Sequence, residues 1–331
     1  MNKISWLFLA VIFAACLASC SRTPEPAANM GQAAATTKDP ASATQTNFYS
    51  FQDSTGEQVA LPKKPERIVV LNTEVLELFY QLGGKAVGRA TAPGIMVPEA
   101  AKDAKEVGDI NNVSLEQIMS LKPDLVIGQP MFHANLKPSM ASAHIPLALI
   151  KIESYSDIQT AAKWVGNMTG NEAQSLAALH KTDKKLQNIV AKLPGHGPNY
   201  AVVTIMPMGV FVQKSSSIAI DMANMLKMKN VADGLPSGNM PSSAPYSLEK
   251  LVVLDPDYIF LLVHGTQEFG NQKLKSDLEN NPAWSSLRAV KEKKMFFLPS
   301  PLFVTNPGLH IDQSLETMAK LVYPDTFPAK E

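Results

Sequence analysis

Residues 113–124 read VSLEQIMSLKPD, and residues 246–257, which lie 133 positions later, read YSLEKLVVLDPD. Ser, Leu, Glu, Leu, Pro and Asp coincide in the two copies, and each copy runs into an apolar segment typical of a strand. A match at one fixed spacing indicates an internal repeat. We therefore predict two homologous lobes, each with its own sheet.

The chain on both sides of the first copy alternates between strand and helix patterns. A Gly-containing hairpin is predicted over residues 48–61, and short continuous apolar runs follow that are typical of parallel strands buried on both faces. Thr73 is expected to cap the first helix. The other expected strands lie near residues 65–71, 86–88, 125–128 and 145–150, and the expected helices cover residues 74–82, 115–121 and 157–165.

One long helical pattern over residues 172–193 precedes a restart of the alternation. At about 1.5 Å per residue this helix would be roughly 33 Å long, enough to connect two lobes. We therefore predict an α/β fold of two Rossmann-like lobes with parallel sheets, joined by one long backbone helix. The expected bounds are an N-lobe over 48–170, a linking helix over 171–193 and a C-lobe over 194–331. The second half is expected to contain strands over residues 200–205, 257–263 and 295–298, and helices over residues 218–228 and 309–322.

The composition excludes several classes of function. The 331 residues include 30 Lys+Arg and 30 Asp+Glu, so there is no excess of positive charge for nucleic-acid binding. The two cysteines, Cys16 and Cys20, both lie at the N-terminus, so neither a disulfide framework nor a multi-cysteine metal site can form.

The N-terminus has the pattern of an export signal. Lys3 is followed by an apolar run that is too short for the ~20 residues of a membrane span. The run ends in Leu-Ala-Ser-Cys20, which resembles the bacterial lipobox, where the cysteine is lipidated after cleavage. We predict a lipoprotein signal peptide over 1–19, lipidation at Cys20 and a disordered tether over 20–47 that is rich in Ala, Thr, Pro, Gln and Ser. An ordinary signal peptide with an incidental cysteine is the alternative.

Three motifs together resemble the substrate-binding proteins of ABC importers for ferric siderophores, haem and cobalamin, the class with a helical backbone. They are PERIV at 65–69, the two Ser-Leu-Glu copies, and WSSLRAVK at 284–291 before a strand. The resemblance covers residues 48–324. It implies that ligand binds in the cleft between the lobes with limited hinge motion, and that a permease and its ATPase are the partners. It also implies a monomer, anchored through Cys20 at the extracytoplasmic face of the cell envelope.

Glu116 and Glu249 occupy equivalent positions in the two copies of the repeat. In the family that this chain resembles, a glutamate on each lobe meets a basic pocket of the permease, which assigns docking to these two residues. The alternative is that each is a first-turn acid favoured by the helix dipole. The dipole explains an acid at each position but not its repetition, which favours docking.

Ligands of open α/β sheets bind beyond the carboxyl ends of the strands. The loops that follow the expected strands are rich in Met and poor in Arg. We expect Arg89 to pair with an acidic group of the ligand. The complete set of predicted ligand-binding residues is Thr73, Arg89, Met131, His133, Met206, Met208, Tyr246, His264 and Phe303.

Met131 and His264 are related by the same 133-residue shift, so each leaves its strand at the equivalent place. A thioether and an imidazole are a suitable axial pair for haem iron. The resemblance supports this in part, because haem-binding members use an N-lobe methionine and a C-lobe His-Gly after a strand, as at His264-Gly265. Their methionine lies where this chain has residues 110–112, so Met131 is inferred from the repeat alone. His133 is the alternative ligand, and simple packing of either side chain is the alternative to ligation.

We predict capture of an iron complex, with haem favoured as cargo rather than as a catalytic cofactor. Cobalamin, another corrinoid or a ferric siderophore are the alternatives, and the scarcity of Arg counts against an acidic siderophore. No nucleophile elbow, phosphate loop, zinc helix or dinucleotide motif occurs in the sequence, so we predict that the protein is not an enzyme. A structural surface lipoprotein is a further alternative, which stabilisation by a small ligand would exclude.

Overall fold

The computed structural model describes residues 47–328, apart from the side chains of Asp277 and Leu278. The predicted signal peptide, Cys20 and the predicted tether up to residue 46 lie outside the described residues. Residues from Gln45 onwards cluster as one compact unit. In the described part of the chain, no helix is both long and apolar enough to cross a membrane.

The described chain begins with the predicted hairpin, formed by antiparallel β1 (Tyr49–Gln52) and β2 (Gln58–Leu61). Asp53 holds its turn, because Oδ1 accepts hydrogen bonds from the backbone and hydroxyl of Thr55. The other carboxylate oxygen accepts the backbone N–H of Leu149 at 3.0 Å. A single buried side chain thus ties the hairpin to the first sheet.

The first sheet has six strands in the order β6-β5-β4-β3-β7-β8, all parallel except β6. Its central strands β3 and β7 are buried along their whole length, as their continuous apolar sequences predict. The strands are β3 (Ile68–Val70), β4 (Ala86–Thr91), β5 (Lys105–Asp109), β6 (Asn112–Val113), β7 (Leu125–Gly128) and β8 (Leu147–Leu149). The helices are α1 (Thr73–Gln81), η1 (Glu99–Ala101), α2 (Leu115–Ser120), α3 (Pro130–His133), η2 (Ala134–Leu136), α4 (Lys137–Ser142) and α5 (Tyr155–Thr169).

Helix α1 begins one residue earlier than predicted, and its cap is Asn72 rather than Thr73. The Asn72 side-chain oxygen accepts the backbone N–H of Glu74 at 2.9 Å. Its amide nitrogen donates to the carbonyl oxygen of Ile150, next to β8. Asn72 can do both because it has a donor and an acceptor, whereas Thr73 is already the first helical residue.

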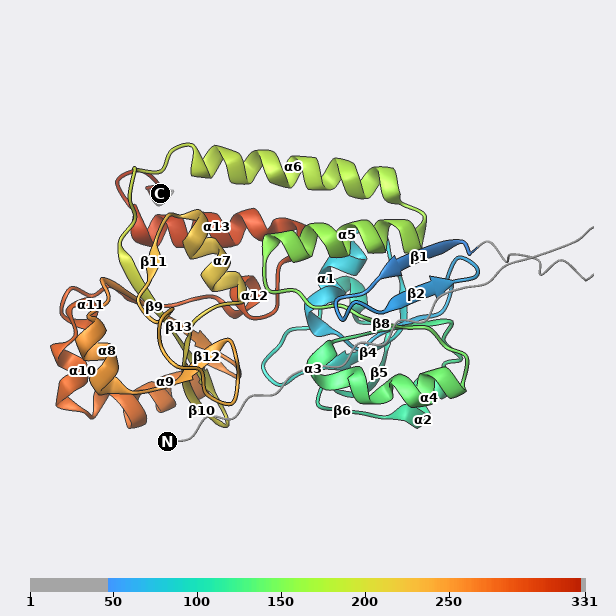
Figure 1. Cartoon of the computed structure of the whole chain (residues 1–331), viewed down its shortest axis with the longest axis horizontal. Coiled ribbons are helices and arrows are strands. Elements are labelled where there is room, and N and C mark those ends of the chain that lie inside the picture. The colour runs from blue at the N-terminus through green and yellow to red at the C-terminus, as the bar shows by residue number, and fades with distance from the viewer. Residues whose placement is uncertain (1–46, 329–331) are drawn as a thin grey trace, which may run out of the picture. The chain divides into compact units, whose positions relative to one another are not determined.

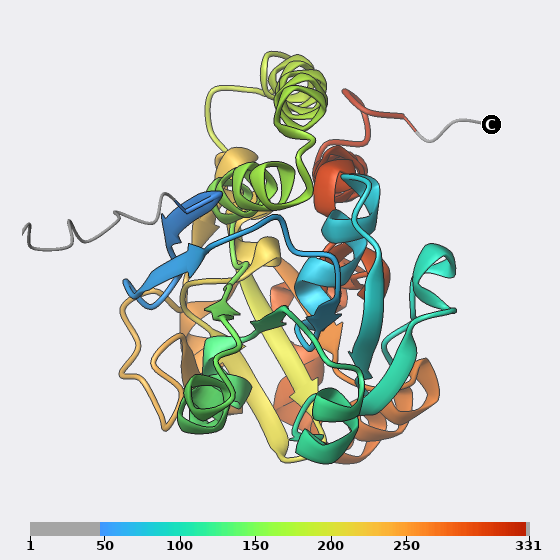
Figure 2. The same cartoon turned by 90° about the vertical axis from the view of Figure 1, so that its right-hand side faces the viewer.

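The long helix α6 (Glu172–Val190) separates the two sheets in the sequence and ends three residues before the predicted bound. It lies over α5 and over the C-terminal helix α13 (Ile311–Val322), as Figures 1 and 2 show. Thr182 donates a hydrogen bond to the Leu309 carbonyl at 2.8 Å, and Lys185 pairs with Asp312 at 2.8 Å. One buried apolar cluster runs through this helical layer and includes strand residues of both sheets, such as Ile127 and Phe260.

The second sheet has the order β12-β10-β9-β13-β14, with β11 beside β9. Strands β9, β13 and β14 are parallel, as predicted, and the short strand β11, which was not predicted, also runs parallel to β9. The strands are β9 (Asn199–Met206), β10 (Gly209–Gln213), β11 (Lys229–Asn230), β12 (Ser243–Pro245), β13 (Tyr258–Val263) and β14 (Met295–Phe297). The helices are α7 (Ile218–Met225), α8 (Leu248–Leu254), α9 (Gln267–Leu274), η3 (Lys275–Glu279), α10 (Pro282–Ser286), α11 (Arg288–Lys291), α12 (Ser300–Phe303), η4 (Gly308–His310) and α13.

Two further strands of this sheet, both paired antiparallel, were not predicted either. A two-residue turn at Pro207-Met208 returns the chain antiparallel to β9 as β10, and β12 then pairs antiparallel with β10. Gly209 has a φ of 149°, a backbone conformation in which glycine is favoured, directly after the turn. The fold class is therefore α/β as predicted, with an antiparallel extension at one edge of the second sheet.

Candidate functional site

The carboxyl ends of parallel strands meet at one edge of each sheet, and six of the nine predicted ligand-binding residues follow these ends. The other three do not, because Arg89 lies inside β4, Met206 is the last residue of β9, and Tyr246 follows the antiparallel strand β12. His264 comes directly after β13, and its backbone N–H donates to the Ile205 carbonyl of neighbouring β9 at 2.9 Å. Met206 is the last residue of β9 and is half-buried. Thr73, also half-buried, follows β3 as the first residue of α1.

The His264 imidazole is largely desolvated. Burial lowers the pKa of His264 below its usual 6.5, so the ring is neutral at pH 7. Neither ring nitrogen has a hydrogen-bond partner among the described residues. A neutral imidazole with an uncommitted nitrogen can ligate a metal ion or accept a hydrogen bond from a ligand.

Three methionines that follow the carboxyl ends of strands are strongly exposed. Met131 and Met208 each expose 75% of their surface, and Met96 exposes 71%. They follow β7, β9 and β4 respectively. Large apolar side chains in solvent gain stability when a ligand covers them, and a thioether adapts to irregular ligand surfaces. Met96 was not among the predicted residues, because the strand was expected to end at residue 88 and only residues 89–91 were assigned to the loop after it.

The loops after β4 and β13 lie against each other. A β-carbon placed on Gly94, whose φ is +75°, would lie 2.5 Å from the carbonyl carbon of Gly265. Only residues without side chains allow two backbones to approach this closely. The loop that carries Met96 therefore touches the loop that begins at His264.

His133 and Arg89 are buried inside the N-terminal half. The Nδ1 atom of His133 accepts the backbone N–H of Gln129 at 2.9 Å, and burial lowers the pKa of His133 to about 4. Arg89 donates from Nε to the Ala101 carbonyl at 3.1 Å, and its buried Nη1 has no partner among residues 47–328. In this structure His133 is fully buried and Arg89 exposes 9% of its surface, and both side chains bond to backbone groups near the predicted site.

Tyr246 and Phe303 pack against the second sheet rather than standing free in solvent. Phe303 lies in α12 and belongs to the large apolar cluster. Tyr246 precedes α8 and packs partly buried against the smaller cluster of the C-terminal half. Burial raises the pKa of Tyr246, whose hydroxyl has no hydrogen-bond partner within residues 47–328.

A buried carboxyl lies at the carboxyl ends of β3, β7 and β8. Burial raises the pKa of Glu74 to about 8, and the nearby charge of Glu153 adds to this effect, while hydrogen-bonding groups of Gln129 and Ile152 oppose it. The Oε2 atom of Glu74 has no partner among the described residues. At neutral pH this carboxyl is therefore largely protonated, and it adds little charge to this edge of the sheet.

The described arginines do not offer a free cation here. Arg67 donates to the carbonyl oxygens at the end of α2, and Arg288 pairs with Asp255 and Asp257 at the opposite end of the second sheet. Lys151, beside β8, pairs with Glu153 at 2.8 Å. The groups at the carboxyl ends of the strands are thus the neutral imidazole of His264 and the exposed thioethers of three methionines, and no set of free arginine cations accompanies them within the described chain.

Two cavities lie away from these loops. One of about 760 Å³ is lined by residues near the start of β9, including Lys214, Lys229 and Asn230. The other, of about 640 Å³, lies beside β2 and is lined by Val59, Pro62 and neighbouring residues. Neither contains a predicted ligand-binding residue. Among the described residues, no group of three or more His, Cys, Asp or Glu side chains could hold a metal ion.

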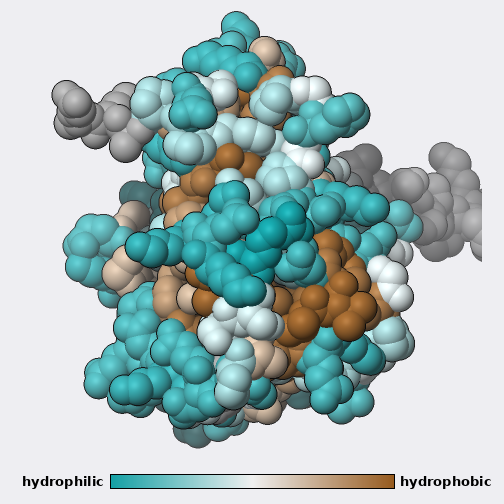
Figure 3. All heavy atoms as spheres, turned by 90° about the vertical axis from the view of Figure 1, so that its left-hand side faces the viewer, coloured by the Kyte–Doolittle hydropathy of each residue, from teal (hydrophilic) through white to brown (hydrophobic). Residues whose placement is uncertain are grey.

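Glu116 and Glu249 are exposed near the start of α2 and α8. Each helix is capped by a serine of the repeat, since Ser114 accepts the N–H of Gln117 at 3.2 Å and Ser247 accepts that of Lys250 at 3.3 Å. Figure 3 faces the side of the molecule that carries α8 in Figure 1, and it shows apolar side chains gathered amid a hydrophilic surface. Val253 of α8 exposes 84% of its surface.

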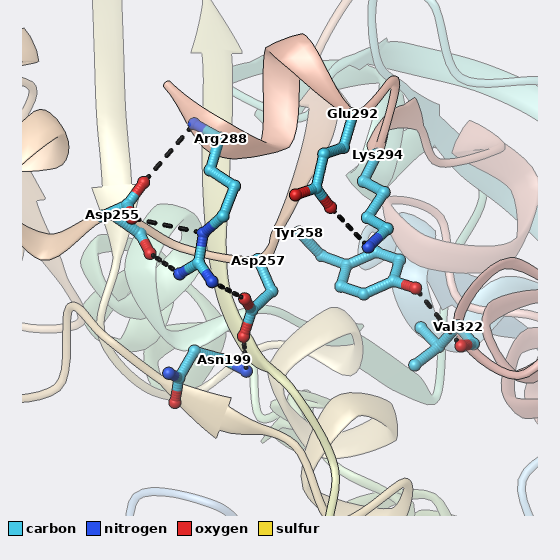
Figure 4. Close-up of polar contacts among 8 residues, drawn as sticks. All are labelled: Asn199, Asp255, Asp257, Tyr258, Arg288, Glu292, Lys294 and Val322. Atoms are coloured by element: carbon cyan, nitrogen blue, oxygen red, sulfur yellow. Dashed lines mark hydrogen bonds and ion pairs between the residues drawn. The ribbon is translucent and has the colours of Figure 1, made fainter. Parts of the chain in front are cut away.

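The two copies of the repeat make the same contacts in both halves. Asp124 accepts the backbone N–H of Arg67 at 2.8 Å, and the equivalent Asp257 accepts that of Asn199 at 2.8 Å (Figure 4). Each carboxylate thereby joins its own strand to the start of the neighbouring strand. A guanidinium holds the end of the helix that precedes each of these aspartates, because Arg67 donates to the Leu121 carbonyl and Arg288 donates to the Asp255 carbonyl.

Comparison with known proteins places these features in context. A family model described as periplasmic binding protein matches residues 68–302. A relative from Bacillus subtilis, described as the uncharacterized ABC transporter substrate-binding lipoprotein YvrC, is 26% identical over 340 residues and covers 99% of each chain.

Solved structures share the two-lobed fold. Staphylococcus aureus IsdE complexed with heme has a TM-score of 0.66 at 21% identity, over 78% of this chain and 99% of that chain. Staphylococcus aureus SirA complexed with staphyloferrin B has a TM-score of 0.64 at 20% identity, over 84% of this chain and 98% of that chain. Chains with this fold have therefore been solved with chemically different ligands.

Proposed function

Because the chain belongs to the periplasmic binding protein family, we propose that it is the substrate-binding component of an ABC importer and captures an iron complex, with haem favoured. Its relative YvrC is described as such a component, and IsdE, with the same fold, was crystallised with heme. The ligand binds between an N-lobe of residues 48–170 and a C-lobe of residues 194–331. The helix over 171–193 links the lobes.

The observation that carries the choice of ligand is the state of His264. Its imidazole is neutral, largely desolvated and without a hydrogen-bond partner among the described residues. A tetrapyrrole iron bound there gains an axial nitrogen ligand. The apolar face of the tetrapyrrole then covers the exposed side chains of Met131 and Met208. Met131 is the proposed second axial ligand. Haem is cargo in this account and takes part in no catalysis.

The charge of the loops weighs against a polyanionic siderophore. Such a ligand would favour several free guanidinium or ammonium groups, but Arg67 and Arg288 are engaged elsewhere and Arg89 is buried. A corrinoid is the second candidate, since it needs no clamp of cations and would cover the same methionines. It differs from haem in not requiring His264 as an axial ligand.

The two equivalent surface helices α2 and α8 are the proposed contacts through which the protein delivers its ligand to the permease. Glu116 and Glu249 dock on basic groups of the permease, which works with its ATPase, and the protein acts as a monomer. Lipidation at Cys20 anchors the protein at the extracytoplasmic face of the membrane. Support for docking comes from the matched serine caps, which hold both glutamates at the same position of equivalent helices.

A ligand panel tests the proposal. Residues 45–331, which form one compact unit, are melted with haemin, cyanocobalamin, ferrichrome or ferric citrate. A ligand at about 100 times its Kd stabilises the native state by about 2.7 kcal/mol, which is a Tm shift of roughly 5 °C or more. We expect haemin to give the largest shift. A panel in which no metal chelate raises the Tm would refute capture of an iron complex.

A further inference from the structure

His264 lies beside Met206 at the carboxyl ends of two neighbouring strands. Strands β9 and β13 are parallel neighbours in the second sheet, and β10 lies on the other side of β9 (Figure 1). Val263 pairs with Ile205, and the backbone N–H of His264 still donates to the Ile205 carbonyl. The ladder thus continues by one residue, which places His264 opposite Met206. Since neighbouring strands are about 4.8 Å apart, the two side chains begin side by side.

Met206 and His264 also belong to the same face of the sheet. Side chains along a strand alternate between its two faces. In β9 and β13, even-numbered residues pack in the large apolar cluster and odd-numbered residues in the smaller cluster of the C-terminal half. The former are Tyr200, Val202, Tyr258, Phe260 and Leu262, and the latter are Ala201, Val203, Ile259 and Leu261. The same alternation assigns both Met206 and His264 to the even-numbered face.

Met208 brings a second thioether to the same end of β9. Pro207 and Met208 form the two-residue turn between β9 and β10, and Met206 pairs with Gly209 across it. The proline ring fixes φ in this turn, which limits how far the two methionines can separate. Gly209 has no side chain to fill the space beside Met206. Because Met208 exposes 75% of its surface, its flexible side chain can turn towards Met206 at little cost in packing.

The donor atoms decide which kind of ion fits. Thioethers are soft ligands that favour Cu(I), and imidazole also suits copper. His264 offers a neutral nitrogen, because burial lowers its pKa and neither ring nitrogen has a partner among the described residues. Hard divalent cations prefer oxygen ligands, and within residues 47–328 no group of three or more His, Cys, Asp or Glu side chains could hold a metal ion. Two sulfur atoms and one nitrogen suit a soft monovalent ion instead.

We propose that Met206, Met208 and His264 form a binding site for Cu(I), with two thioether sulfur atoms and one imidazole nitrogen as ligands. The bare ion belongs to a different class of ligand from the iron complex of the proposed function, and the inference stands without that function. Both ligands use His264, so one of them occupies the site at a time. The ion binds and leaves as Cu(I), and no electron is transferred.

A competition titration tests this site. Residues 45–331 form one compact unit and contain no cysteine, so no thiol competes for the metal. Under argon, with ascorbate to keep copper reduced, the protein is titrated into the coloured Cu(I) complex of bicinchoninate. The variants are Met208→Leu, Met206→Leu with Met208→Leu, and His264→Ala. Leucine keeps the apolar character and approximate volume of methionine and removes only the sulfur.

Met119→Leu is the matched control, because Met119 is exposed on α2, which packs against the first sheet. We expect wild type and Met119→Leu to take one equivalent of Cu(I) from bicinchoninate. Each of the other variants should bind Cu(I) at least about tenfold more weakly, since even groups that only orient metal ligands contribute that much to metal affinity. All variants should melt within a few degrees of wild type.

Carbon-13 labelling of the methionine methyl groups gives a second readout that needs no variant to fold. One equivalent of Cu(I) should shift two methyl resonances of wild type, and these are the two that the double variant lacks. Wild-type protein that takes no Cu(I), or a double variant with unchanged affinity, would overturn the site and leave the proposed function standing. Protein that binds Cu(I) but no iron complex would overturn the proposed function alone.

Discussion

Gly94 and Gly265 face each other so closely that a β-carbon on Gly94 would lie 2.5 Å from the Gly265 carbonyl carbon. The two residues belong to loops that follow strands of different sheets, so the contact joins the N-terminal and C-terminal halves of the molecule. In the proposed function, ligand bound at His264 would lie next to this contact. A substitution at this contact therefore tests whether the two halves move apart when ligand binds.

Gly94→Ala is expected to separate these loops. The clash with backbone atoms of Gly265 adds to the roughly 1 kcal/mol that a side chain costs at positive φ. Gly56→Ala is the control, because Gly56 has a similar φ of +83° but nothing within 4 Å of an added β-carbon. We expect Gly94→Ala to change the ligand association rate several-fold and Gly56→Ala to leave it unchanged. Identical stopped-flow rates for the two variants would argue against opening at this contact.

Haem affinity should be insensitive to moderately acidic pH. Burial lowers the pKa of His264 below 6.5, so its imidazole stays neutral at a pH where a free histidine is half protonated. Protonation removes the lone pair that ligates iron, so affinity is retained at pH 6.5 and falls only in more acidic solution. Titrations from pH 7.5 to pH 5 measure this. A midpoint at or above pH 6.5 would contradict the role of a desolvated His264.

Stability should fall as the pH rises, because of Glu74. The folded state keeps the proton of Glu74 until about pH 8, whereas the ordinary pKa of a glutamate is 4.5. Between these values the folded state binds more protons than the unfolded state, so the free energy of unfolding decreases with increasing pH. The full effect is on the order of a few kcal/mol.

Glu74→Gln removes this proton and should flatten the pH dependence of the free energy of unfolding, with a gain in stability above pH 7. Urea unfolding at pH 5.5, 7 and 8.5 measures the change. Equal slopes for wild type and Glu74→Gln would show that Glu74 is charged in the folded protein at neutral pH.

Arg288→Gln should loosen the end of α8. The variant loses ion pairs to Asp255 and Asp257 and a hydrogen bond to the Asp255 carbonyl. Because Arg288 is partly exposed and solvent screens its pairs, we expect a loss of about 1 kcal/mol in the free energy of unfolding. Weaker binding to the importer should accompany this loss, since α8 carries Glu249.

Lys294→Gln is the control for Arg288→Gln. Lys294 forms an exposed pair with Glu292 in the same region (Figure 4) but does not touch α8. We expect no change in stability or in binding to the importer. If both variants weakened importer binding equally, the effect would come from charge in general rather than from the seating of α8.

Much of the fold follows from the sequence because its two copies of one motif have strong local signals. Ser114 and Ser247 cap their helices, and Asp124 and Asp257 connect adjacent strands. Because these local contacts depend on particular residue types, they leave a repeated pattern that can be recognised in the sequence. Strand β10 was missed because the signal for its turn is only Pro207-Met208 before a glycine. Short runs of apolar residues do not reveal their direction in a sheet.

The candidate site was less predictable than the fold. His133 and Arg89 have the residue types of a binding site, but tertiary packing buries both. Met96 belongs to no recognisable sequence motif, and it becomes a candidate only because the structure shows that its side chain is exposed. Whether a side chain after a strand points to solvent or to the core depends on contacts distant in sequence, such as that between Gly94 and Gly265.

The most direct test of capture at His264 is a haemin titration of residues 45–331 followed at the Soret band. His264→Ala and His180→Ala are titrated alongside, since His180 is exposed on α6 and serves as the control. We predict a shifted Soret band that saturates at one equivalent in wild type and in His180→Ala and is lost in His264→Ala. A protein that gives no saturable haem response but binds cyanocobalamin or a ferric siderophore would contradict haem capture at His264.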